Sequence, residues 1–220
     1  MLSQEQIAAN QTRFESLLRK TDKDPTEIEN LITFLNKSDF FVAPSSAKYH
    51  GNYMGGLCEH SLNVYDTALL IAQGLNLFDN GTNTDKVNDR GQELYTESTL
   101  IISTLLHDLC KVNMYKPAEK WTKNAENRWV SYNGYNKKYQ MPYGHGEYSV
   151  ELIRSFVKLN RAEMLAIRWH MGFFDPGVIF PGETKFAFDE AVKVCPLVSV
   201  VLTADYLSSQ LLEPTFSPQF

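Results

Sequence analysis

Histidine and aspartate residues recur at five places along the chain, each inside a segment whose other residues are largely apolar. These residues are His60, His107, Asp108, His145, His170 and Asp205. Taken singly, such a histidine is more often a satisfied core residue than a ligand. Several buried imidazoles and carboxylates need partners, however, and a divalent cation satisfies many of them at once. Two histidines and two aspartates suit an octahedral site for a hard or borderline cation better than a structural zinc site, which prefers thiolates.

The elements that must position these residues have the spacing of helices. Apolar residues recur every three or four positions from 57 to 72, from about 97 to 109, from 144 to 159, from 161 to 171 and onward from Pro196. His60 lies on the stripe formed by Leu57 and Val64, and Asp205 lies on the apolar face of the last segment. We therefore expect four helices, and the start of a fifth at His145, to direct polar side chains inward.

The first 40 residues carry two helix-start signals. Ser3 is followed three residues later by Gln6, which is a capping box. Asp24 can cap a second helix in which Pro25 occupies the first position. We therefore expect two N-terminal helices within residues 1–40.

Residues 112–143 interrupt this pattern with a stretch that has no helical period. Two aromatic segments flank the turn-prone residues 124–127, which predicts an inserted loop with a β-hairpin. The stretch carries six Lys or Arg residues against two Glu, with two Trp and five Tyr. Such a mixture can stack on bases and hold phosphates, or the aromatic rings can simply pack the hairpin on the helices. The candidate substrate-binding residues here are Trp121, Trp129, Lys137 and Lys138.

Composition limits the class of protein and of partner. The 220 residues are 43% hydrophobic and 21% charged, which suits one domain over 1–220 with a full core. The net charge of −5 argues against stable binding of a nucleic-acid duplex or an anionic membrane. The three cysteines form no C-x-x-C pair, and we assign Cys58 and Cys110 to packing. Without an apolar leader or an apolar run of about 18 residues, we expect a cytoplasmic protein with no membrane partner.

Five short motifs follow one another in the order H…HD…H…H…D. They are Gly-Gly-Leu-Cys-Glu-His at 55–60, Leu-Leu-His-Asp-Leu-Cys-Lys at 105–111, Gly-His-Gly at 144–146, Arg-Trp-His-Met-Gly at 168–172 and Thr-Ala-Asp-Tyr at 203–206. In this order the chain resembles the HD-domain metal-dependent phosphohydrolase superfamily over roughly residues 40–210. The first motif is most similar to the HD domain of bacterial 3′-to-5′ exoribonucleases.

The resemblance implies an all-α fold, an HD-domain helical bundle with a small inserted hairpin, and a divalent cation as cofactor. It places the principal ion on His60, His107, Asp108 and Asp205. In relatives with two ions, the counterpart of Asp108 bridges them, and the positions of His145 and His170 bind the second ion. Those relatives often have two adjacent histidines at the last histidine motif, whereas His170 stands alone. We therefore expect one ion with room for a second, its identity open among Mn, Mg, Ni, Co, Fe and Zn.

Three further residues near these motifs have two interpretations each. Lys111 can contact a phosphate or neutralise the negative C-terminal end of its helix. Glu59 can act as a base or an outer ligand, although an exposed acid at a helix N-terminus is favoured. His50, in a glycine-containing loop, is either a lid or phosphate contact or a surface turn residue.

The proposed metal ligands and the family resemblance together predict metal-dependent hydrolysis of a phosphoester in a nucleotide or short nucleic acid, through a metal-activated water. The expected catalytic residues are Asp108, His145, His170 and Lys111, and His50 is expected to contact the substrate. One alternative is a 3′-to-5′ exonuclease on single-stranded RNA or DNA, although the helical N-terminus leaves no place for the OB module of the exoribonucleases. A second is a non-catalytic nucleotide-binding HD regulatory module, against which the complete ligand set argues. A third, by fold analogy alone, is a di-iron oxygenase.

Overall fold

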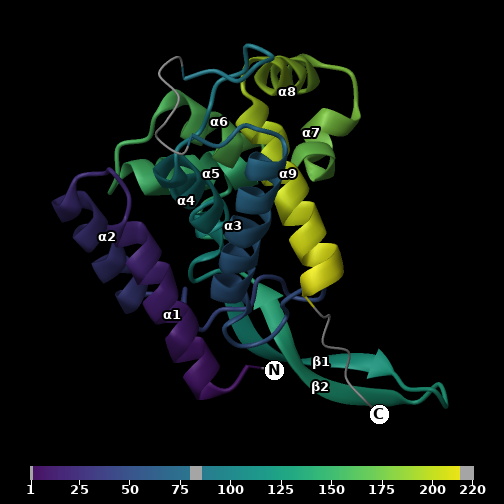
Figure 1. Cartoon of the computed structure of the whole chain (residues 1–220). Coiled ribbons are helices and arrows are strands. Elements are labelled where there is room, and N and C mark those ends of the chain that lie inside the picture. The colour runs from purple at the N-terminus through teal and green to yellow at the C-terminus, as the bar shows by residue number, and fades with distance from the viewer. Residues whose placement is uncertain (1, 80–85, 214–220) are drawn as a thin grey trace.

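The computed structural model describes residues 2–79 and 86–213, which are mostly helical with one small two-stranded sheet (Figure 1). The helical class expected from the sequence is therefore confirmed. The single domain expected over residues 1–220 begins and ends outside the described residues.

Both N-terminal helices form where their start signals predict them. The Ser3 hydroxyl accepts a hydrogen bond from the Gln6 backbone N–H at 3.2 Å, and Gln6 Oε1 accepts one from the Ser3 N–H at 2.7 Å. This capping box begins α1, which spans Gln4–Arg19. The Asp24 carboxylate accepts from the N–H of Thr26 at 2.8 Å and begins α2, which spans Pro25–Lys37.

Five helices form the body of the molecule that carries the polar residues. They are α3 (Gly56–Gly74), α4 (Glu97–Leu105), α5 (His145–Arg154), α6 (Arg161–Trp169) and α9 (Pro196–Leu207). Helix α3 lies near the centre of Figure 1 and packs on α4 and α9, while α6 packs on α5 and α9. Leu57, Ile101 and Val201 are fully buried in their shared core. Because each such side chain contributes about 1.5–3 kcal/mol by burial, the core fixes which helix faces point inward.

Three of these helices are shorter than the periodicity predicts. Helix α4 ends at Leu105, so the expectation that His107 and Asp108 lie on a helix from 97 to 109 is wrong. Both residues lie in a turn that leads into the 3₁₀ turn η1 (Leu109–Lys111). Helix α6 ends at residue 169 and not at 171, and α5 ends at 154 and not at 159.

Histidine side chains give a physical reason for the early end of α4 and α6. His107 Nδ1 lies 2.6 Å from the carbonyl oxygen of Thr104, and His170 Nδ1 lies 2.7 Å from that of Ile167. A side chain that bonds to a carbonyl three residues earlier competes with the helical hydrogen-bond ladder. The same bond turns each imidazole so that its Nε2 atom faces the interior.

The inserted segment forms the predicted hairpin. Strand β1 (Tyr115–Lys123) pairs antiparallel with β2 (Trp129–Lys137), and Tyr115 lies opposite Lys137 in the register. The turn closes with a 3.0 Å bond from the Asn127 N–H to the Asn124 carbonyl, and Asn127 has a φ of 61°. The hairpin projects from the helical body in Figure 1. Its root is anchored, because the Tyr115 ring is buried.

Four elements between α6 and the C-terminal end of the described chain were not among those expected from the sequence. They are η2 (Gly172–Phe174), α7 (Pro176–Ile179), α8 (Glu183–Val194) and the π-helical turn η3 (Ser208–Leu212). Within residues 2–79 and 86–213, none of the helices is both long and apolar enough to cross a membrane.

Candidate metal centre

Two buried histidines face each other at the centre of the bundle. His60 comes from α3 and His107 from the turn after α4, and their Nε2 atoms lie 3.2 Å apart. The Nδ1 atom of His60 lies 2.9 and 3.0 Å from the Glu213 carboxylate oxygens, and that of His107 bonds to a carbonyl. Carboxylate and carbonyl oxygens only accept, so both Nδ1 atoms carry the proton. The two Nε2 lone pairs therefore point at one another and need a cation or a proton between them.

Two aspartates complete the group around these nitrogens. Asp108 Oδ2 lies 3.5 Å from His107 Nε2 and 3.6 Å from His60 Nε2, and Asp205 Oδ1 lies 3.3 Å from His60 Nε2. The fold thus brings together all four residues expected to hold the principal ion. The ligand atoms of His60, His107 and Asp205 lie close enough for one cation, and those of His107, Asp108 and His170 form an adjoining group. We call His60, His107, Asp108 and Asp205 the primary group.

The opposite side of Asp108 faces the other two expected ligands. Asp108 Oδ1 lies 2.7 Å from His145 Nε2 and 3.6 Å from His170 Nε2. His170 is fully buried, and its Nε2 atom has no hydrogen-bond partner among the described residues. Because its Nδ1 donates to a carbonyl, this Nε2 holds a free lone pair. Asp108 therefore contacts both pairs of imidazoles, and the His107 ring also lies against that of His170, with their centroids 4.8 Å apart.

Electrostatics keep the carboxylates ionised. Burial acts to raise the pKa of Asp108, but Lys111 and His107 outweigh it and hold that pKa well below its usual range. Burial opposes ionisation of Asp205 in the same way, and His60 and His107 lower its pKa. Burial lowers the pKa of His60, yet Glu213 and Asp205 raise it to about 10. His60 therefore takes up a proton when no cation is bound, and a metal ion must displace that proton.

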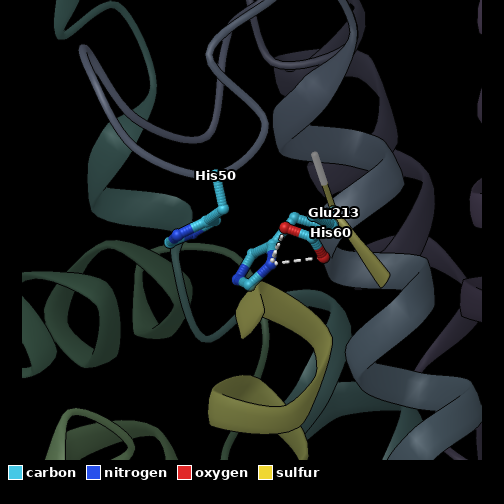
Figure 2. A group of neighbouring side chains, drawn as sticks. All are labelled: His50, His60 and Glu213. Atoms are coloured by element: carbon cyan, nitrogen blue, oxygen red, sulfur yellow. Dashed lines mark hydrogen bonds and ion pairs between the residues drawn. The ribbon is translucent and has the colours of Figure 1, made fainter. Parts of the chain in front are cut away.

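Glu213 is the residue of the centre that sequence reasoning missed. It follows η3, and Figure 2 shows its carboxylate joined to the His60 ring by two dashed lines. The side chain is 1% exposed and also accepts a bond from Asn63 Nδ2 at 3.2 Å. A carboxylate on the outer nitrogen of a ligand histidine fixes its tautomer and raises its basicity. Glu213 lies outside every apolar stripe, so no sequence pattern could have found it.

His50 lies against the same imidazole from another segment (Figure 2). Its ring centroid is 5.0 Å from that of His60, and its Nε2 atom is buried with no hydrogen-bond partner among the described residues. Burial, followed by the nearby His60 and Lys111, lowers the pKa of His50 to about 4. His50, His60 and Glu213 form a further group with ligand atoms close enough for a cation. A surface turn histidine, the alternative expectation, does not describe this residue.

Two neighbours of Asp108 in the sequence also contact the centre. Lys111 Nζ lies 2.5 Å from Asp108 Oδ2 and its side chain is 12% exposed, so it pairs with a carboxylate of the centre. Cys110 Sγ lies 3.3 Å from His145 Nδ1, so the expectation that this cysteine only packs was incomplete. Cys58 is buried in the core as expected. Glu59 accepts a hydrogen bond from the Tyr53 hydroxyl at 2.6 Å.

The expected substrate-binding residues of the hairpin lie on its surface. The Trp121 side chain is 59% exposed and that of Trp129 64% exposed, and Lys123 Nζ lies 5.6 Å from the Trp129 ring centroid. Lys137 and Lys138 are also exposed. Both tryptophans lie toward the turn end of the hairpin, because Trp129 pairs with Lys123 and Trp121 with Ser131 in the register. The fold therefore leaves these residues free to meet a ligand without placing them in the centre.

Comparison of the chain with protein-family models, with curated proteins and with solved structures gives no match. The function must therefore be inferred from the residues of the centre. Its imidazoles and carboxylates are a donor set that divalent first-row metals accept. The facing Nε2 atoms and the free Nε2 of His170 are groups that such an ion would satisfy.

Proposed function

We propose that this chain is an HD-domain type phosphohydrolase that requires a divalent cation bound by the primary group. The observation that carries the proposal is the 3.2 Å approach of the His60 and His107 Nε2 atoms, each with its Nδ1 proton committed elsewhere. The order of the five sequence motifs supports the same family. The proposed reaction is hydrolysis of a phosphoester of a nucleotide or short nucleic acid.

The residues around Asp108 have separate tasks in this proposal. The bound cation would lower the pKa of a water molecule and neutralise charge on the phosphoryl oxygens. Lys111 adds a fixed positive charge beside Asp108 Oδ2, which favours an anionic substrate at this point. His145 bonds to Asp108 Oδ1 and its side chain is 28% exposed, so it is placed to contact a substrate oxygen. His170, with its free Nε2, can contact the phosphate or hold a second ion.

The nature of the substrate is inferred from charge. The chain is acidic overall, yet the hairpin segment is basic and exposes aromatic rings. A local patch of this kind suits a mononucleotide or a short single strand, and a long duplex would meet an acidic surface. The exposed hairpin also keeps the exonuclease alternative open, because a strand could lie along it. Lys137 and Lys138 would then contact backbone phosphates.

Hydrolysis by purified protein loaded with Mn²⁺ tests the proposal. The panel contains phosphomonoesters, cyclic nucleotides and oligonucleotides, and the variants are Asp108→Asn and the control Asp189→Asn. Asp189 is a surface aspartate of α8 that pairs with Lys185 at 2.6 Å, so its loss should change nothing. We expect Asp108→Asn to abolish hydrolysis with unchanged circular dichroism.

Three other results have distinct meanings. Full activity of Asp108→Asn contradicts the assignment of the centre. Metal-loaded protein that binds nucleotides and hydrolyses nothing in the panel contradicts the hydrolase and favours the regulatory module. Stepwise shortening of oligonucleotides from the 3′ end, with no action on mononucleotides, favours the exonuclease.

A further inference from the structure

A cavity of about 390 Å³ lies beside the candidate metal centre and shares His145 with it. Its other walls come mainly from the segment after β2 and from the residues before β1 and within α5. They include Met114, Tyr139, Met141, Pro142, Tyr143 and Tyr148. Cys110, the hydrogen-bond neighbour of His145, also lines it. One side chain therefore separates the cavity from Asp108, which lies 2.7 Å from His145 Nε2.

The cavity is built from a buried floor and an exposed rim. Met114 is 5% exposed, whereas Tyr139 is 63% and Tyr143 54% exposed. Within the rim segment, the Tyr143 N–H donates to the Met141 carbonyl at 2.9 Å and closes a tight turn. Gln140 Nε2 donates to the Asn113 carbonyl at 2.8 Å and ties the rim to the floor. The tyrosines are thus presented by an anchored segment and remain open to a ligand.

The chemistry of the walls selects one kind of ligand group. No Lys, Arg, Asp or Glu is among the described residues that line the cavity, so a second phosphate has no counter-charge there. Aromatic faces prefer planar rings, and the tyrosine hydroxyls can bond to polar edges. The volume lies within the range of about 300–1,000 Å³ typical of small-molecule sites.

We propose that this cavity holds the planar, uncharged ring of the substrate, the base of a nucleotide, while the phosphate lies on the far side of His145 near Lys111. The inference rests on the proposed function, since it assigns the organic part of that substrate. It moves the recognition of a single base from the exposed tryptophans of the hairpin to Tyr139 and Tyr143. An oligonucleotide could still contact the hairpin with its remaining bases.

Binding of phosphate-free nucleosides tests the cavity without hydrolysis. The probes are adenosine, guanosine, cytidine and uridine, titrated by NMR into the parent and into Tyr139→Ala/Tyr143→Ala. We expect at least one nucleoside to bind the parent and the double variant to weaken its Kd roughly 5- to 150-fold, the range of lost base stacking. Tyr139→Phe/Tyr143→Phe should retain most of the binding, because the ring faces remain. Phe186→Ala, which removes an exposed ring on α8, should bind like the parent.

A kinetic comparison separates this inference from the proposed function. For a hydrolysed nucleoside monophosphate, the double alanine variant should raise KM and keep kcat, and it should leave KM for ribose 5-phosphate unchanged. Nucleoside binding that depends on the tyrosines, in a protein that hydrolyses nothing, would uphold the cavity and overturn the proposed function. Hydrolysis with equal KM values for both substrates, and no nucleoside binding, would overturn the cavity and uphold the proposed function.

Discussion

Replacing Glu213 should weaken metal binding although this residue lies outside the primary group. Glu213→Ala removes both contacts to His60 Nδ1, at 2.9 and 3.0 Å, and leaves a buried N–H without its acceptor. The imidazole then loses its fixed orientation and the anion that raises its basicity. Loss of such an outer partner typically costs about 10- to 100-fold in metal affinity, which is about 1.4–2.8 kcal/mol. Glu213→Gln should lose less, because its amide oxygen can still accept from Nδ1.

The assay is a competition titration of Mn²⁺ against a fluorescent chelator, with circular dichroism to confirm the fold. Glu190→Ala is the matched control, since its side chain is 66% exposed on α8 and pairs only at the surface with Lys193. We expect the affinity to fall in the order parent and control, then Glu213→Gln, then Glu213→Ala. A Glu213→Ala protein that is folded and binds Mn²⁺ with the parent affinity would refute the role assigned to this carboxylate.

Three further predictions follow from the same geometry. Alanine variants of His145 and His170 should lose turnover and still keep one metal ion per chain, as measured by elemental analysis. Loss of all metal in either variant would move that residue into the primary group. Asn160→Ala removes the N-terminal cap of α6, the helix that ends directly before His170. It should lower the free energy of unfolding by about 1 kcal/mol in urea titrations, and an unchanged midpoint would contradict this role of the cap. Replacing Trp121 and Trp129 by Ala should raise KM for an oligonucleotide and leave KM for a mononucleotide unchanged. Parent-like KM values for both substrates would show that these two rings do not bind the substrate.

Helical periodicity predicted the inward direction of the residues that lie on regular helices. His60 follows the apolar stripe of α3, and Asp205 lies on α9 as expected. Burial of the apolar face of a helix also turns inward the polar side chains that lie on that face. His107, Asp108 and His170 were expected in the right region but on the wrong element. The side chains of His107 and His170 bond to backbone carbonyls where the helices end, and hydrophobic periodicity carries no signal for such a bond.

The rest of the centre depends on tertiary contacts between distant segments. Glu213 reaches His60 across more than a hundred residues of chain, and Asn63 holds it there. The cavity depends on the rim segment 139–143 folding back beside His145. Neither segment has a repeating pattern, so only the packed structure brings them to the site.

The metal content of the protein tests the central claim most directly. Parent protein and the double variant His60→Ala/His107→Ala are loaded with Mn²⁺, passed through a desalting column and measured by elemental analysis, with circular dichroism as the check on folding. The facing Nε2 atoms predict at least one retained ion per parent chain and almost none in the folded double variant. A parent that retains no divalent metal, or a double variant that retains as much as the parent, would contradict a metal centre at these histidines.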